Sequence, residues 1–243
     1  MGCDSERNVE SEIIDAMLDR SSDGVNMDIP ARVLDSETKY RGAIFHVDDR
    51  RIALTRNNGD QIVIRRQVLV HAPCVVMLVH DCVRDTYLIE REYRAGIGRF
   101  TYGLPAGLID HDEDPHTAAL RELREETGVV ADTDGDVHFD IVGDYYSSEG
   151  MTDELAHIFV LHLHAWHATH TEFDGDEHVE STWVGWDDLL TLPVTASNSR
   201  FSMNGYADYV NCRLNSREAK SHVPPWNVPY WDTCKHDQVQ CIR

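Results

Sequence analysis

The chain has 243 residues, enough for one main domain with a sizeable core and additional segments. Its 43 acidic residues outnumber its 22 Lys and Arg residues, and the formal net charge of −21 opposes binding to nucleic acid and to anionic membranes. No apolar run approaches the roughly 20 residues that span a bilayer, and the acidic N-terminus lacks the basic and then apolar pattern of a signal peptide, so we expect a cytoplasmic protein.

The first part of the chain predicts an acidic segment followed by strands. Residues 1–28 are acidic and contain a short helix around 10–18, to which we assign no function. Residues 29–72 form an N-terminal strand region. Apolar and polar residues alternate there at 31–42, 44–54 and 61–70, and a turn at 57–60 separates the last two stretches. This pattern predicts antiparallel strands with a hairpin.

We expect residues 73–221 to form the main domain, with strands before and after a central helix. The expected strands are 74–79, 86–90, 140–145, 156–164 and 181–184, and further helices are expected at 186–192 and 202–214. Helices would then cover both faces of a mixed sheet, which is an α/β architecture. Residues 222–243 contain several Trp and Pro residues and are expected to form an extended tail.

The most informative segment is 107–129, which reads GLIDHDEDPHTAALRELREETGV. Glu122, Glu125 and Glu126 stand at i, i+3 and i+4, so a helix places them on one face. Neighbouring carboxylates repel one another unless a cation neutralises them, and Mg²⁺ prefers carboxylate, water and phosphate oxygens. The spacing therefore predicts a metal site on this helix.

The residues that flank the acidic positions predict where the helix begins and ends. Asp114 can cap free backbone amides, and Pro115 suits the first turn. Gly128 can adopt the left-handed conformation that commonly ends a helix. Arg121 can pair with Glu113 or Glu125 and so hold the carboxylates in position.

Nine positions of this segment match the pattern G-x5-E-x7-R-E-U-x-E-E-x-G-U, in which U is a bulky apolar residue. A solvated acidic helix would require neither the glycines nor the arginine at fixed positions. The segment closely resembles the signature box of the Nudix hydrolases. The resemblance implies a Nudix α/β/α sandwich with a mixed sheet and an additional N-terminal antiparallel strand region.

The resemblance extends over about 32–192 and favours the ADP-ribose pyrophosphatase branch of that family. The stretches that carry it are 40–42 with Phe45, the string EREYR at 90–94, LPAG at 104–107 and YYSSEGMTDE at 145–154. Gly103 and Glu149 depart from the branch, which usually has Glu and Pro at these positions. In that branch the N-terminal strands exchange across a homodimer, so the resemblance implies that this chain dimerises.

The resemblance also implies which residues form the catalytic site. Glu122, Glu125 and Glu126, with the carbonyl of Ala106, would hold Mg²⁺ or Mn²⁺ between the protein and a diphosphate. The catalytic set would comprise Glu126, Arg121 and a general base from the acidic loop 173–181. Glu177 is the favoured base and Glu180 the second choice, against the alternative that the loop is simply a solvated acidic segment.

Arginines are the expected phosphate contacts, because a guanidinium can bind two phosphate oxygens at once. The candidates are Arg66 and Arg94, with Arg65 and Arg91 as second choices, and for each the alternative is a surface ion pair. Phe45 or Tyr40 could stack on an adenine, although an aromatic residue in a strand often packs in a core.

The expected substrate is a small molecule linked to a nucleoside diphosphate. ADP-ribose, which would give AMP and ribose 5-phosphate, is favoured. The alternatives are a hydrolase of dinucleoside polyphosphates or of noncanonical nucleoside triphosphates, and a sensor that binds a nucleotide without cleaving it. We expect no zinc site among the histidines, because their spacing shows neither Cys partners nor an H-E-x-x-H pattern. The histidines considered are 157, 162, 164, 167, 170 and 178.

Overall fold

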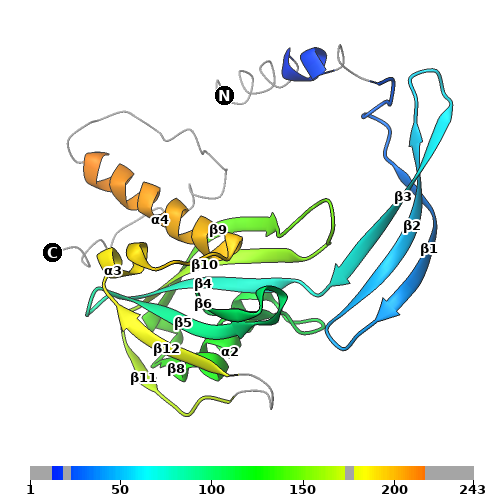
Figure 1. Ribbon diagram of the computed structural model, residues 1–243. Coiled ribbons are helices and arrows are strands. Elements are labelled where there is room, and N and C mark those ends of the chain that lie inside the picture. The colour runs from blue at the N-terminus through cyan, green and yellow to red at the C-terminus, as the bar shows by residue number, and fades with distance from the viewer. Residues whose placement is uncertain (1–12, 19–22, 173–177, 217–243) are drawn as a thin grey trace. The chain divides into compact units, whose positions relative to one another are not determined.

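The computed structural model of the protein describes residues 13–18, 23–172 and 178–216 (Figure 1). The chain divides into two compact units, residues 1–70 and 71–243. Within the described residues, no helix combines the length and the apolar character needed to cross a bilayer.

The first unit contains a three-stranded sheet in the order β1, β2, β3. Its strands are β1 (Arg32–Arg41), β2 (Phe45–Thr55) and β3 (Gln61–His71). β1 and β2 pair antiparallel, and every residue of β1 is exposed. The strands expected from the alternating pattern are therefore confirmed, and the described part of the expected N-terminal helix, 13–18, is helical.

The second unit is built on a larger mixed sheet in the order β12, β5, β4, β10, β9. Its strands are β4 (Cys74–Asp81), β5 (Thr86–Arg94), β9 (Val137–Tyr146), β10 (Leu155–Leu163) and β12 (Val179–Val184). β4 and β10 run parallel, whereas the other neighbours in this order are antiparallel. All residues of β4 are buried, as expected of a central strand covered on both faces.

Short elements extend this unit at its edges. β6 (Arg99–Gly103) pairs with β5, β7 (Ala106–Leu108) pairs with β4, and β8 (Val129–Ala131) pairs with β11 (Trp166–Ala168). The short helices η1 (Ala95–Ile97) and η2 (Asp134–Asp136) precede β6 and β9. The sequence did not predict β6, β7, β8 or β11, because strands this short carry little periodicity.

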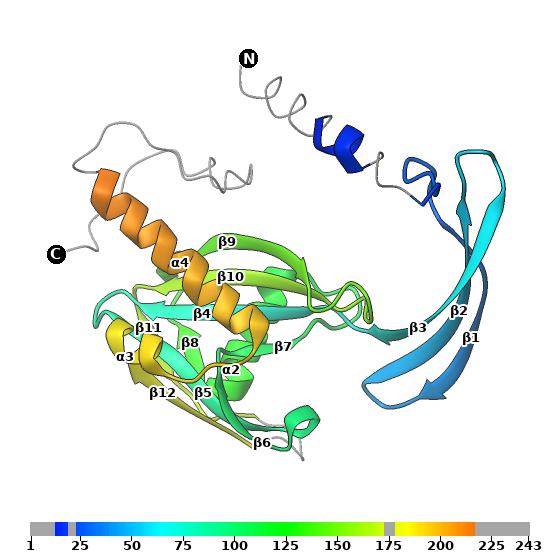
Figure 2. The same ribbon diagram turned by 45° about the horizontal axis from the view of Figure 1, so that its top comes forward.

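Helices cover both faces of the larger sheet, as Figure 2 shows for α2 and α4. The helices are α2 (Pro115–Thr127), α3 (Trp186–Thr191) and α4 (Ser197–Ser216). Leu123 of α2 packs with Val75 and Leu161 in one core, which defines the α2 face of the sheet. Met203 of α4 packs with Leu78 in the other core, which defines the α4 face. The expected α/β/α sandwich is confirmed.

Several elements are longer than the sequence predicted, and β5 and α4 differ most from their expected bounds. β5 continues to Arg94, four residues beyond the expected end, because its polar final residues pair with β6 and β12. α4 begins at Ser197 instead of 202. The expected tail at 222–243 lies outside the described residues.

Candidate functional site

The ends of α2 are formed as its sequence predicts. The Asp114 carboxylate accepts hydrogen bonds from the backbone N–H groups of His116 at 3.0 Å and Thr117 at 3.2 Å, and Pro115 is the first helical residue. Gly128 ends the helix with φ of 68°, and its N–H donates to the carbonyl of Arg124 at 2.9 Å. These contacts fix the helix that carries the acidic residues.

β7 lies directly beside two of the acidic side chains. A Cβ atom at Gly107 would lie 2.0 Å from the carboxyl carbon of Glu122, so this carboxylate occupies the space that any side chain would fill. The backbone N–H of the preceding residue, Ala106, donates to Glu126 Oε2 at 3.2 Å. Glycine at position 107 thus allows Glu122 and Glu126 to gather at one short strand.

Glu126 lies in a buried and strongly negative environment. Burial, together with the nearby charges of Glu90 and Glu122, raises the pKa of Glu126 to about 10, while the Ala106 N–H acts in the opposite direction. Glu90 belongs to β5 and is only 3% exposed. No role was expected for Glu90 from the sequence, where its only signal is its place in the string ERE, two residues before Glu92.

Arg121 contacts several of the acidic side chains near Glu126. Its guanidinium donates to both carboxylate oxygens of Glu113, at 2.9 and 2.8 Å, and to Glu125 at 3.0 Å. It also pairs with Glu122 at 2.9 Å and donates to the carbonyl of Leu108 at 2.8 Å. Both ion pairs expected for Arg121 are therefore present, and these hydrogen bonds raise the pKa of Arg121 and lower that of Glu113. Its part in catalysis stays a prediction.

Glu125 contacts a second arginine in addition to Arg121. Its carboxylate accepts from Arg121 at 3.0 Å and from Arg124 at 3.1 Å. The structure thus brings Glu122, Glu126 and Glu90 together, and it holds Glu125 between two arginines. Helical spacing alone did not distinguish Glu125 from the other two.

The gathered oxygens fit a hard divalent cation. A buried carboxylate among other carboxylates is costly in its charged form, and a bound cation removes that cost. The donors around Glu126 are carboxylate oxygens, which suit Mg²⁺ or Mn²⁺ better than a softer metal. The donor set therefore agrees with the metal predicted from the sequence.

Strand alternation separates the arginine candidates of β5. Leu88 packs on the α2 face and Ile89 on the α4 face, so Glu90, Glu92 and Arg94 follow Leu88 on the α2 face. Arg94 pairs with Glu92, whose charge also acts on Glu126. Arg94 is therefore on the same face as the carboxylates of α2.

Arg91 and Glu180 lie on the other face of the sheet. They are register partners in β5 and β12, and Arg91 Nε donates to Glu180 at 3.0 Å. With Phe100, His178 and Val179 they line a cavity of about 540 Å³. This pairing disfavours Glu180 as the base and Arg91 as a phosphate contact.

A second cavity, of about 520 Å³, lies between the first residues of α2 and strands β9 and β10.

The remaining candidates belong to the first unit or to the part of the chain that is not described. Arg65 Nε donates to both carboxylate oxygens of Asp49 at 2.8 Å, and Arg66 donates to the carbonyl of Arg65 at 2.9 Å. The rings of Tyr40 and Phe45 have centroids 5.9 Å apart. The roles of Arg66 and Phe45 stay predictions. Glu177 lies outside the described residues.

Comparison with known proteins gives consistent matches. A family model described as NUDIX domain matches residues 70–204. The chain is 31% identical over 129 residues to an ADP-ribose pyrophosphatase of Bacillus subtilis, covering 53% of this chain and 66% of that protein. It is 33% identical over 128 residues to an ADP-ribose pyrophosphatase of Mycobacterium tuberculosis, covering 52% of this chain and 57% of that protein. This chain thus spans just under two thirds of the first relative and a smaller share of the second.

A solved structure supports the fold assignment. It is titled "Crystal structure of ADP compounds hydrolase", and it superposes with a TM-score of 0.58 at 21% identity, covering 76% of this chain and 96% of that one. At this identity the likeness concerns the fold. Because the family model covers more than half of the chain, including α2 and its acidic box, this protein belongs to the Nudix family.

Proposed function

We propose that this protein is a metal-dependent hydrolase that cleaves the pyrophosphate bond of a nucleoside diphosphate derivative. The observation that carries the proposal is the gathering of Glu90, Glu122 and Glu126 beside β7, where Gly107 leaves room for a carboxylate. ADP-ribose is the favoured substrate, with AMP and ribose 5-phosphate as products. Two relatives named ADP-ribose pyrophosphatase support this choice.

The groups that would hold Mg²⁺ or Mn²⁺ are the carboxylates of Glu90, Glu122, Glu125 and Glu126 and the carbonyl of Ala106. When bound, the cation would neutralise diphosphate oxygens and lower the pKa of the attacking water. Arg121 would hold Glu113, Glu122 and Glu125 in place through the ion pairs described above. This arrangement keeps the acidic side chains in position before substrate arrives.

The remaining steps fall to groups outside α2. Glu177 would take a proton from the water whose oxygen attacks one phosphorus atom, and the bond from that phosphorus to the bridging oxygen would break. The bridging oxygen would leave with the other phosphate. Arg94 would contact phosphate, since it lies on the α2 face beside Glu92. Arg66 is proposed as a further phosphate contact, and Phe45 as a ring that stacks on an adenine.

We also propose that the protein is a cytoplasmic homodimer formed through its N-terminal strands. The support is the exposure of all residues of β1 and of several apolar side chains in this unit. These apolar side chains are Val33, Leu34, Tyr40, Ile44 and Phe45. Light scattering of the full chain after gel filtration should give a mass of twice 27.7 kDa, and a monomer would contradict this proposal.

The deciding experiment measures phosphate-containing products from a panel of substrates with Mg²⁺ or Mn²⁺. The panel contains ADP-ribose, a dinucleoside polyphosphate, a nucleotide hexose and nucleoside triphosphates. Release of AMP from ADP-ribose is expected from the wild type and not from Glu126→Gln. Glu172→Gln is the matched control, because Glu172 is an exposed carboxylate that reaches Arg124.

The other outcomes of this panel have distinct meanings. Faster turnover of a dinucleoside polyphosphate would keep the site and change the substrate. A nucleoside monophosphate and pyrophosphate formed from a triphosphate would assign the protein to clearance of noncanonical nucleotides. Tight nucleotide binding without turnover of any substrate would contradict the hydrolase and favour a sensor.

A further inference from the structure

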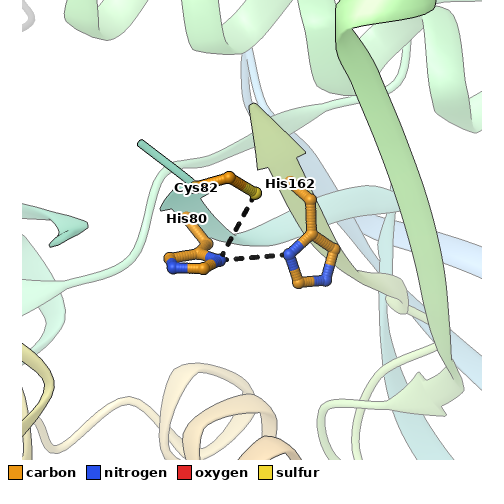
Figure 3. A group of neighbouring side chains, drawn as sticks. All are labelled: His80, Cys82 and His162. Atoms are coloured by element: carbon orange, nitrogen blue, oxygen red, sulfur yellow. Dashed lines mark hydrogen bonds between the residues drawn. The ribbon is translucent and has the colours of Figure 1, made fainter. Parts of the chain in front are cut away.

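A second group of metal-binding side chains lies away from the acidic residues of α2. His80, Cys82 and His162 each offer one ligand atom, and these atoms all lie within 4.8 Å of one another (Figure 3). His80 of β4 and His162 of β10 are register partners in the parallel pair, and Cys82 directly follows β4. The three side chains therefore meet where β4 and β10 end.

Two of the three distances between the ligand atoms are close to those of a small tetrahedral site. The two Nδ1 atoms are 3.2 Å apart, and Cys82 Sγ lies 3.8 Å from His80 Nδ1. A tetrahedral zinc ion with ordinary bond lengths would hold two nitrogens about 3.3 Å apart and a nitrogen and a sulfur about 3.6 Å apart. Small adjustments of the side chains would therefore suffice to bind the ion.

The outer ring nitrogens of both histidines face carboxylates. His80 Nε2 lies 3.0 Å from Asp85, and His162 Nε2 lies 3.3 Å from Asp140. A carboxylate accepts hydrogen bonds, so both Nε2 atoms are placed to donate, and in that tautomer each Nδ1 lone pair points into the space between the two rings. A metal ion in that space would bind both Nδ1 atoms in place of their mutual contact at 3.2 Å.

The surroundings of the histidines are those of a supported metal site. Ligating histidines commonly donate their other N–H group to a carboxylate, as both do here. His80 is 7% exposed and stacks on Tyr87 with centroids 4.6 Å apart.

This group is separate from the acidic site. His80 follows Val76 and Leu78 on the α4 face, whereas Glu122 and Glu126 belong to α2, which covers the other face. Val76 is the register partner of Ala106, so His80 lies four residues further along β4, about 13 Å at the usual rise of a strand. One ion could not serve both groups.

We propose that His80, Cys82 and His162 form a zinc site that ties the end of β4 to β10. Two imidazole nitrogens and a thiolate suit Zn²⁺, while Mg²⁺ prefers oxygen. Binding would release the proton of the Cys82 thiol, and a water molecule would complete the four ligands. The site does not depend on the reaction proposed above.

The first test measures zinc in the full-length protein. The protein is stripped with a chelator, loaded with Zn²⁺ in the presence of excess Mg²⁺ and passed through a gel-filtration column. About one zinc ion per chain is expected by elemental analysis, as for a single structural site. Absence of retained zinc in the wild type would overturn the proposal.

Variants then locate the ion. Cys82→Ser and His162→Asn are expected to lose the retained zinc, and Asp140→Ala to weaken its binding by about 10- to 100-fold. His167→Asn is the histidine control, because His167 pairs with Asp132 at 2.7 Å outside this group. Glu126→Gln should keep the zinc. Equal zinc content in the wild type and Cys82→Ser would contradict the site.

Cobalt gives a test that does not rely on zinc retention. Co²⁺ bound to the wild type should show the charge-transfer absorption of a cobalt–thiolate bond, and Cys74→Ala should show the same band. Cys74 is the matched cysteine, since it lies in the same strand six residues from His80. The band should be missing in Cys82→Ser. Its absence from the wild type would show that Cys82 is not a ligand.

Discussion

Gly107 and Glu122 occupy adjoining space: a Cβ atom at position 107 would lie 2.0 Å from the carboxyl carbon of Glu122 and 2.2 Å from one of its oxygens. The glycine and the glutamate are therefore required together. This relationship explains why the acidic box includes a glycine fifteen residues before its first α2 glutamate.

Gly107→Ala should displace the Glu122 carboxylate and reduce kcat/KM by about 100-fold, the effect of a misplacement of roughly 1 Å at a catalytic site. Isothermal titration with Mn²⁺ should show weaker metal binding. Gly96→Ala is the control, because a Cβ atom at Gly96 meets nothing within 4 Å. Equal kinetics for the wild type and Gly107→Ala would show that Glu122 is not needed where it lies.

Without metal, Glu126 should make the protein less stable as the pH rises. Its pKa is raised from 4.5 to about 10, so the folded chain retains a proton that the unfolded chain releases, and stability falls between these two values. Glu126→Gln should have a higher Tm than the wild type at about pH 8 in a chelator. Addition of Mg²⁺ should raise the Tm of the wild type more than that of the variant.

The comparison needs melting curves of both proteins from about pH 5 to pH 9, with the chelator and with Mg²⁺. At about pH 5 the two proteins should differ least, because the folded wild type then has a neutral carboxyl group. A wild-type Tm that increases steadily over this range in the chelator would show that Glu126 is not the destabilising group.

Arg121→Ala should lower the free energy of unfolding by about 1.5–3 kcal/mol, because it removes hydrogen bonds to charged partners that are largely buried. Arg121→Lys should recover part of this loss, since lysine keeps the charge without the planar set of donors. Urea unfolding provides the measurement. Arg124→Ala is the control, with an expected loss below about 1 kcal/mol, because Arg124 is more exposed and pairs with Glu125 and the exposed Glu172.

Arg94→Ala should reduce kcat/KM for the best substrate by about 10- to 100-fold, the loss of one hydrogen bond to a charged group. Arg91→Ala should leave kcat/KM nearly unchanged, because Arg91 pairs with Glu180 on the opposite face of β5. Steady-state kinetics of the two variants separates these expectations. A larger effect at Arg91 than at Arg94 would contradict this expectation and place the phosphate contact on the face of β5 that carries Arg91.

Glu177→Gln should lower kcat by about 10²- to 10⁴-fold, the usual contribution of a general base, with little change in Mn²⁺ affinity. Glu180→Gln is the matched control, because Glu180 belongs to β12 and its carboxylate accepts a hydrogen bond from Arg91. Unchanged kcat in Glu177→Gln would exclude this residue as the base.

The helix α2 is the part of the protein that the sequence predicts most completely. Asp114, Pro115 and Gly128 act through contacts within a few residues of their own positions, and short-range backbone chemistry is the same in any fold. The spacing of the acidic residues predicted a metal site, and the nine-position pattern that includes them carried the resemblance to the Nudix family. The strands of 3–5 residues were not predicted, because pairing with a neighbour and not their own pattern makes them strands.

Only the tertiary structure decided which distant side chains meet. The pairing of β5 with its neighbours buries Glu90 near Glu126 and turns Arg91 away from Arg94. His80 and His162 are 82 positions apart, and the expectation of no zinc site did not consider His80. The parallel pairing of β4 with β10 places the two histidines side by side, since strand register brings together residues that no spacing along the chain connects.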